Sequence, residues 1–355
     1  MAVNGDAQTV HVHRLPQSKY IDEVRWIPAL SAFDRYFAAA VFDFDSDASA
    51  IEIHSLDQSN PANPILQSSW SSPSRISSLR VSQVFQKPLV AACTLAGRLH
   101  VLFPDAVDGS IRSEVTVPDD SLHHGAISFC DVQESASEFV TVGEDGRVNL
   151  VSIGNSRSSH RCIFDCDGLA SFTAVKWASP TEFATGGVGF GLQWWDLRER
   201  PGGPASEFKA NWSVGTTSGI VHSIDIHPSR KHTCLAGGSS GTVFAWDLRW
   251  PQQPVILSAA TAVEMENSSP AESEVWEVHF DGYMRSLNIG NNSSRILPVM
   301  ICSEDGILAV IEEGQEPVEL LAEPCAINSF DIDRQNPADV VCSLEWESIA
   351  ILARP

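Results

Sequence analysis

One apolar spacing recurs seven times along the 355-residue chain and constrains its fold more than any other sequence feature. In each copy a second apolar residue follows the first after three positions, and a third follows after two more, as in Ile21, Val24 and Trp26. The copies begin at residues 21, 76, 127, 172, 221, 275 and 327. Repeats of about 51 residues indicate a repeat architecture. Because seven such units account for the whole length, we expect a single domain over residues 1–355.

A second landmark inside each unit is a pair of short apolar segments around a tight turn. The stretches FVTVGEDGRVNLVSI (139–153) and VMICSEDGILAVIEE (299–313) show it clearly. Apolar residues alternating at period two indicate half-buried strands, and Glu-Asp-Gly between them indicates a hairpin. Each unit thus supplies one strand, a hairpin and a more variable fourth strand. Four antiparallel strands repeated seven times predict an all-β fold, a seven-bladed β-propeller.

The two ends of the chain provide an independent test of ring closure. The last unit has strand-like segments at 327–333, 339–344 and 348–353 and then ends without a fourth. At the other end, residues 10–15 (VHVHRL) precede the first unit and have no partner of their own. We therefore predict that residues 10–15 form the outer strand of the last blade. Such closure covers a strand edge that would otherwise be exposed.

Composition excludes several classes of function. The formal net charge is −22 and the isoelectric point is near 4.7. This balance disfavours a nucleic-acid surface and adhesion to anionic lipid, and it favours either simple solubility or basic partners. No apolar run approaches the ~20 residues of a membrane-spanning helix, and the first 20 residues lack a secretory signal. The eight cysteines show no paired framework, so we expect reduced thiols in a cytosolic or nuclear protein.

Three segments could suggest chemistry, and each is better explained by structure. The glycine-rich stretch Gly186–Gly191 lacks the spacing of a dinucleotide loop and is predicted to be a hairpin turn. Cys162 and Cys166 with nearby His160 lack the second half of a zinc site, so free thiols are expected. His123 stands just before an inner strand, where a structural role is expected. We predict no enzyme, no cofactor, no metal and no small-molecule substrate.

Two units end their third strand with the same tetrapeptide, Trp-Asp-Leu-Arg. The copies are Trp195, Asp196 and Arg198 in unit four, and Trp246, Asp247 and Arg249 in unit five. This signature resembles that of WD40 repeats, in which the Trp-Asp pair is a folding element. The Asp–His–Ser/Thr–Trp network of such repeats is incomplete here: unit three keeps Thr141 and Asp145 without the Trp. Unit four keeps Thr185 and Trp195 but has Gly189 in place of the Asp.

Four further stretches carry a narrower resemblance. VTVGEDGRVNL (140–150), EVWEVHF (274–280), CSEDGIL (302–308) and AINSFDI (326–332) occur in an order similar to that of the small WD-repeat nucleoporins. The resemblance implies a non-catalytic scaffold subunit of the Y-shaped complex in the outer rings of the nuclear pore, at the nuclear envelope. It also implies docking on α-solenoid nucleoporins, with no direct contact to nucleic acid and no membrane insertion. Pore assembly and transport of protein and mRNA are the implied processes.

A second class of function remains open. Substrate receptors of cullin-RING ubiquitin ligases are often WD propellers with a Trp-Asp-x-Arg motif, and Arg198 and Arg249 stand at the matching positions. In that alternative these two arginines contact the ligase adaptor. Leu-Arg after Trp-Asp is, however, common in WD repeats of other function.

The repeat also suggests where a partner could bind. The step of three between the first two apolar positions breaks the alternation of a strand, which requires a bulged extra residue and re-aims side chains at the rim of a sheet. We therefore expect the two residues after each first apolar position to point toward the mouth of the channel. The candidates for partner binding are Trp276, Phe129, His222, Glu277 and Asp22. Aromatic residues at such places are enriched among interface hot spots, although they can also simply cover the rim. The acidic stretch 262–274 is predicted to be a mobile loop.

Overall fold

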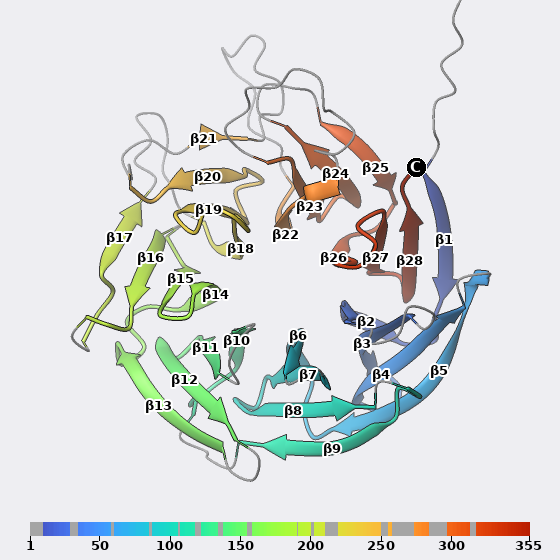
Figure 1. The fold of residues 1–355 in the computed structure, drawn as a ribbon, viewed down its shortest axis with the longest axis horizontal. Helices are drawn as coiled ribbons and strands as arrows, with labels where there is room; N and C mark the ends of the chain where they lie inside the picture. The colour runs from blue at the N-terminus through green and yellow to red at the C-terminus, as the bar shows by residue number, and fades with distance from the viewer. Residues whose placement is uncertain are drawn as a thin grey trace, which may run out of the picture.

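The structure, a computed structural model, describes fifteen ranges of the chain: 10–28, 35–57, 60–84, 87–105, 107–117, 122–133, 138–154, 158–189, 191–199, 202–209, 219–249, 255–257, 273–283, 297–312 and 317–355. Strands in these ranges form seven four-stranded antiparallel sheets arranged in a ring (Figure 1). Residues of the inner strands, such as Arg25, Arg80 and Lys176, line a central channel. The chain is therefore all-β and folds as a seven-bladed β-propeller, as the repeat predicted. Most of the acidic stretch 262–274 lies outside the described residues. Within them, no helix has the length and hydropathy needed to cross a bilayer.

In the first four blades the strands follow chain order from the channel outward (Figure 1). Blade one contains β2 (Tyr20–Ile27), β3 (Arg35–Asp43), β4 (Ala48–Asp57) and β5 (Asn60–Ser72). Blade two contains β6 (Ile76–Val84), β7 (Lys87–Thr94), β8 (Leu99–Pro104) and β9 (Ile111–Thr116). Blade three contains β10 (Ile127–Val132), β11 (Glu138–Gly143), β12 (Arg147–Ile153) and β13 (Ser158–Asp165). Blade four contains β14 (Phe172–Ser179), β15 (Glu182–Gly187), β16 (Gly191–Asp196) and β17 (Ser206–Lys209).

The last three blades follow the same plan, with one exception at the end. Blade five contains β18 (Val221–Ile226), β19 (Thr233–Gly238), β20 (Phe244–Asp247) and β21 (Val255–Ile256). Blade six contains β22 (Val275–Phe280), β23 (Val299–Ser303), β24 (Ile307–Ile311) and β25 (Val318–Ala322). Blade seven contains β26 (Ile327–Ile332), β27 (Asp339–Leu344), β28 (Ser348–Ala353) and, as its outer strand, β1 (His11–Pro16).

Strand β1 closes the ring by pairing antiparallel with β28, from His11 opposite Ala353 to Pro16 opposite Ser348 (Figure 1). The predicted closure is thus confirmed, with the strand at 11–16 rather than 10–15. The pairing begins at His11 because β28 ends at Ala353, which leaves Val10 opposite no strand residue. Leu15 of β1 is 5% exposed and packs in the cluster between blades seven and one.

The predicted bulge is present in every inner strand. The register between the first and second strands of each blade shifts immediately after the first apolar position, for example between Ile21 and Glu23 and between Val275 and Glu277. A bulge places two residues opposite one and turns the strand. The first of the two residues, such as Asp22 or Trp276, is partly exposed in all seven blades, whereas the second is buried in five of them.

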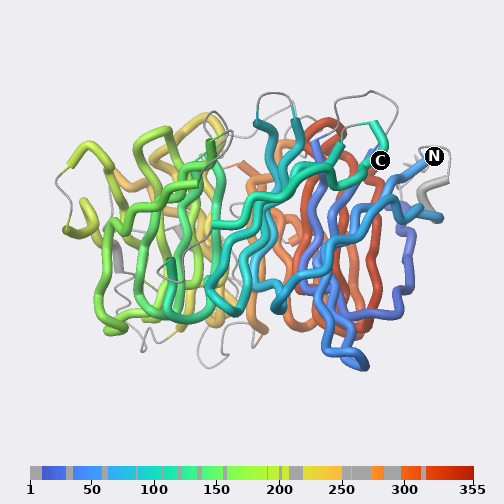
Figure 2. The backbone as a smooth tube through the Cα atoms, turned by 90° about the horizontal axis from the view of Figure 1, so that it is seen from below, coloured from blue at the N-terminus to red at the C-terminus, as the bar shows by residue number. Residues whose placement is uncertain are grey.

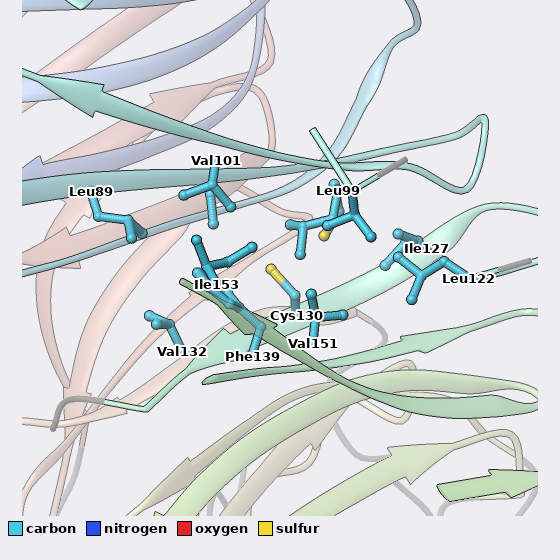
Figure 3. Close-up of a cluster of buried hydrophobic side chains, with 13 residues drawn as sticks. Leu89, Leu99, Val101, Leu122, Ile127, Cys130, Val132, Phe139, Val151 and Ile153 are labelled. Atoms are coloured by element: carbon cyan, nitrogen blue, oxygen red, sulfur yellow. The ribbon is translucent and has the colours of Figure 1, made fainter. Parts of the chain in front are cut away.

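The hydrophobic core of the described residues is divided into seven clusters, and each cluster lies between two neighbouring blades. In the cluster between blades two and three, Leu99 and Val101 face Cys130 and Phe139 (Figure 3). Burial of apolar area contributes about 25 cal/mol per Å². Because this area is shared between blades, the sheets stabilise one another around the ring.

Antiparallel connection sorts the loops onto two faces. We call the entry face the side on which the chain enters each inner strand. It also carries the turns between the second and third strands, at residues 44–47, 95–98, 144–146, 304–306 and 345–347 among others. In Figure 2 the β3–β4 turn projects from the lower edge of the ring, whereas the C-terminus lies toward the upper edge. The entry face and the face near the C-terminus are therefore opposite surfaces.

Candidate functional site

A ring of charged side chains lines the channel. Each inner strand carries a polar residue between its second and third apolar positions, and these residues alternate in charge almost completely around the ring. In blade order they are Arg25, Arg80, Asp131, Lys176, Asp225, His279 and Asp331. Because seven is an odd number, positive and negative residues cannot alternate all the way around the ring. The two adjacent arginines, Arg25 and Arg80, share the carboxylate of Glu23 instead.

Ion pairs and hydrogen bonds connect different blades across the channel, and some of these blades are far apart in sequence. Arg25 Nη2 lies 2.5 Å from Glu277 Oε1, which joins blade one to blade six. Both side chains are at most 7% exposed. Arg25 also donates to the carbonyl oxygen of Phe330 in blade seven at 2.9 Å. Lys176 Nζ of blade four lies 3.3 Å from Asp225 Oδ1 of blade five.

The carboxylates of the ring also accept backbone hydrogen bonds from the next blade. The backbone N–H groups of Trp177, Phe280 and Trp26 donate to Asp131 at 2.8 Å, Asp225 at 2.9 Å and Asp331 at 2.8 Å, respectively. On the channel side an inner strand has no neighbouring strand to accept its N–H groups. Buried backbone donors require a partner, and the ring of aspartates supplies it.

The pKa values of these groups follow from burial competing with opposite charges. Burial acts to raise the pKa of Asp225, but Lys176 and His279 outweigh burial and hold that pKa well below its usual value. Glu277 is also held well below its usual pKa, because Arg25 and His279 outweigh the effect of burial. Burial raises the pKa of Asp331, since Arg25 compensates it only in part. This arrangement can cross-link blades electrostatically, and each of its charged groups already has an ion-pair or hydrogen-bond partner within the ring.

Glu277 corrects one expectation from the sequence. It was predicted to point toward solvent at the mouth of the channel, but it is 3% exposed. The bulge presents the first residue after the apolar position to the rim and turns the second into the ring. Glu277 accepts from the backbone N–H of Phe330 at 3.0 Å and from His279 Nε2 at 3.2 Å, in addition to its pair with Arg25. It is therefore part of the interior and not an exposed contact.

The other partner-binding candidates occupy separate parts of the rim and channel. Trp276 and His222 lie together, with ring centroids 4.7 Å apart, and Trp276 Nε1 donates to Glu304 Oε2 at 2.7 Å. Phe129 lines the channel instead, beneath the guanidinium of Arg80 at 3.9 Å. Asp22 lies on the entry face in blade one, where it is paired with Arg75. It therefore belongs to a different blade from Trp276, which lies in blade six.

The WD signature is structural in both copies. Trp195 and Trp246 are 2% and 1% exposed, and Trp195 Nε1 donates to Thr185 Oγ1 at 2.9 Å. Asp196 and Asp247 each accept hydrogen bonds from the arginine two positions later. The hydrogen bonds from Arg198 lower the pKa of Asp196 to about 2. The side chains of Arg198 and Arg249 are nevertheless largely exposed, at 62% and 63%.

The hydrogen-bonded network of WD repeats is most nearly complete in blade three. His123 Nδ1 lies 2.9 Å from Asp145 Oδ1, and His123 Nε2 lies 3.0 Å from Thr141 Oγ1. Burial acts to raise the pKa of Asp145, but hydrogen bonds from His123 and from the backbone N–H of His124 lower it to about 2. Asn149 Nδ2 lies 3.1 Å from His123 Nε2 and completes the contact on the side where the Trp is missing. His123 thus has the structural role that the sequence predicted.

The segments that could have suggested chemistry have ordinary structural positions. The glycine-rich stretch connects β15 and β16 as a hairpin, with Gly189 at φ +83°. Cys162 and Cys166 are free thiols. Among the residues that the structure describes, no group of three or more His, Cys, Asp or Glu side chains could hold a metal ion.

Sequence reasoning missed the charged ring, although a signal for it exists. The residue between the second and third apolar positions of each repeat is charged or a histidine in all seven units. The bulged residues were predicted to contact a partner, whereas this middle position was assigned no role. The apolar residues at the tips of the turns on the entry face were not predicted either.

The closed ring, the paired WD signature and the His–Asp–Thr network define a WD-repeat β-propeller. No family model matches the chain. It is, however, 59% identical over 358 aligned residues to the nuclear pore complex protein NUP43 of Arabidopsis thaliana, across 97% of this chain and 98% of that protein. The chain belongs to the NUP43 family of nucleoporins, which confirms the resemblance found in its motifs.

More distant relatives agree over shorter regions. Nucleoporin Nup43 of Homo sapiens is 30% identical over 171 residues, which is 48% of this chain and 38% of the human protein. The nuclear pore complex protein nup43 of Dictyostelium discoideum is 26% identical over 247 residues, or 63% of this chain and 53% of that protein.

Proposed function

We propose that this protein is a scaffold subunit of the nuclear pore complex and acts without catalysis. The observation that carries the proposal is the near full-length identity to a plant protein named for the nuclear pore complex. Similarity to the human and Dictyostelium relatives supports the same location, the nuclear pore at the nuclear envelope. The fold suits such a role, since a closed ring with its channel charges paired internally presents rigid outer faces for binding.

At a finer level, we propose that the propeller docks on α-solenoid nucleoporins of the Y-shaped outer-ring complex. Through that complex it would support pore assembly and the transport of protein and mRNA. The resemblance of the four motif stretches supports this assignment, and the acidic net charge of −22 favours basic partners. Trp276, His222, Phe129 and Asp22 remain our candidates for partner contacts.

Two measurements test the proposal. A fluorescent fusion of the full chain should label the nuclear rim in a punctate pattern, and a diffuse signal in nucleus and cytoplasm would contradict pore membership. Affinity purification from native nuclear extract should recover solenoid subunits of the Y complex in near-equal amounts. Recovery of other pore subunits without the Y complex would contradict the finer assignment alone.

The exposed side chains of Arg198 and Arg249 keep a second function in view, that of a substrate receptor of a cullin-RING ligase. Their pairs with Asp196 and Asp247 supply a structural explanation that does not require an adaptor. The double variant Arg198→Ala/Arg249→Ala distinguishes the two functions. A scaffold subunit should keep its pore localisation and its co-purifying partners, whereas a ligase receptor should lose its cullin adaptor.

A further inference from the structure

Three exposed apolar side chains stand on consecutive blades of the entry face. Trp346, Phe44 and Leu95 occupy the turn between the second and third strands of blades seven, one and two, and their exposed fractions are 64%, 62% and 51%. Blades seven and one come from opposite ends of the chain and are neighbours in the closed ring, in which β1 is the outer strand of blade seven. Turn tips are usually polar, so exposed apolar residues at three adjacent tips form an unusual surface.

Packed aromatic residues connect these tips on the blade-one side. The ring of Phe44 lies 4.8 Å from that of Phe42 and 5.8 Å from that of Tyr20. The guanidinium of Arg75 covers Phe42 at 4.5 Å, and the carbonyl oxygen of Arg75 accepts the backbone N–H of Leu95 at 3.0 Å. These contacts hold Phe44 and Leu95 in one surface that exists before any partner arrives.

The same surface continues into blade seven. Tyr20 Oη accepts a hydrogen bond from Asn328 Nδ2 at 2.9 Å. Glu345, the neighbour of Trp346, is close enough to Tyr20 to act on its pKa, and its backbone N–H donates to Ala326 at 2.9 Å. Trp346 is therefore attached to the same structural unit as Phe44.

Carboxylates surround the apolar tips. The turns of blades one and seven carry Asp43, Asp45, Asp47, Glu345 and Glu347. The nearby cations are few: Arg75 is paired with Asp22 at 2.6 Å, Lys19 is paired with Glu52 at 2.6 Å, and Arg98 ends the turn of blade two. We call this surface the acidic aromatic arc, formed by Phe44, Asp45, Asp47, Leu95, Glu345, Trp346 and Glu347.

A hollow beside Leu95 adds a place for an anchoring side chain. It has a volume of about 250 Å³ and is lined by Pro73, Ser74, Ala96, Gly97, Arg98 and His123. Interface anchors typically fill such pockets next to exposed aromatic residues.

The charge of the arc determines which occupant fits. A second copy of this chain would place carboxylates against carboxylates, and nucleic acid or anionic lipid would meet the same repulsion. We propose that the acidic aromatic arc binds a segment of a neighbouring pore subunit in which lysine or arginine side chains surround an apolar anchor. The proposal rests on the pore function proposed above, and it names the docking surface and the chemistry of the partner.

Variants of the full-length tagged protein test the arc. Phe44→Ala/Trp346→Ala removes the two largest exposed tips, and Asp45→Lys/Asp47→Asn changes the charge while Asn keeps the left-handed φ of 50° at position 47. The matched control Val107→Ala/Leu169→Ala removes apolar side chains that are 80% and 90% exposed elsewhere. All variants should melt within a few degrees of wild type. We expect the aromatic variant to recover about tenfold less of its pore partners and the charge variant several-fold less, with the control unchanged.

Photocrosslinking identifies what lies on the arc. A photoreactive phenylalanine analogue at position 44 should cross-link to a lysine- and arginine-rich segment of a pore subunit, and the same analogue at position 107 should not. Crosslinks to another copy of this chain, to an acidic segment or to nothing would overturn the proposal. If the wild type recovers pore subunits and both arc variants recover them equally well, the arc is wrong and the pore function stands. If the wild type recovers no pore subunit, the pore function itself fails, and the crosslink at position 44 still decides the chemistry of the arc.

Discussion

Removing the carboxylate of Glu277 is the perturbation that tests the charged ring most directly. In Glu277→Ala, Arg25 loses two hydrogen bonds, at 2.5 and 3.2 Å, and the buried N–H of Phe330 loses its acceptor. Breaking a buried ion pair typically costs about 3–5 kcal/mol. Because Glu23 still pairs with Arg25, we expect the lower end, about 3 kcal/mol.

The assay is chemical denaturation followed by tryptophan fluorescence, comparing the free energies of unfolding. The control Glu319→Ala changes an exposed glutamate on the outer strand β25 and should stay within about 0.5 kcal/mol of wild type. Glu277→Gln keeps an acceptor for the backbone N–H of Phe330, so its loss of unfolding free energy should lie between those of Glu319→Ala and Glu277→Ala. A loss below about 1 kcal/mol in Glu277→Ala would show that the ring contributes little to stability.

A double variant separates the pair from the packing around it. Arg25→Met/Glu277→Ala removes the Arg25 guanidinium, which Glu277→Ala alone leaves buried without this carboxylate partner. We expect it to be destabilised by at least about 1 kcal/mol less than the sum of the two single variants, because interacting residues are not additive. Additive losses would contradict an energetic link between blades one and six.

Three further outcomes are expected. Deleting residues 1–16 removes β1 and the buried Leu15 and exposes the edge of β28; we expect aggregation or a melting temperature lower by many degrees in scanning fluorimetry, and an unchanged melt would contradict ring closure. Acidification should destabilise the protein, since the pKa values of Glu277 and Asp225 are held below their usual range. Their contribution is complete above about pH 4.5 and is lost as the pH falls through the lower folded-state values, whereas Asp331, with a raised pKa, acts in the opposite direction. Denaturation at a series of pH values measures this, and Glu277→Gln should show a shallower loss. Trp276→Ala should remain folded and recover less of the pore complex, and unaltered recovery would leave Trp276 as a cover of the channel rim.

Much of the blade could be predicted from local sequence. The period-two alternation located the strands, and the step of three located the bulge in every inner strand. Both features act within a few residues, so they can be read from neighbouring positions. The closing strand was found because residues 10–15 and the last unit each lacked a partner, and in the structure both of its ends lie one residue later, at 11 and 16.

The direction of the side chains after each bulge was predicted less well. Trp276 and Asp22 are partly exposed near the start of their inner strands, whereas Glu277 turns inward and Phe129 lines the channel. A bulge changes the side of the sheet on which the next residue points, and that change depends on the register with the neighbouring strand. The alternation of residues alone does not report this register.

The sequence by itself determined the seven blades, their strand order and the WD family of the fold, because repeat length, alternation and turn residues are local properties of the chain. Only the tertiary structure decided which charges meet across the channel and which turn tips adjoin. Arg25 and Glu277 are 252 positions apart, and Trp346 and Phe44 belong to the last and first blades. These pairs meet because closure of the ring fixes the distances between blades, and contacts of that kind depend on geometry rather than on neighbouring residues.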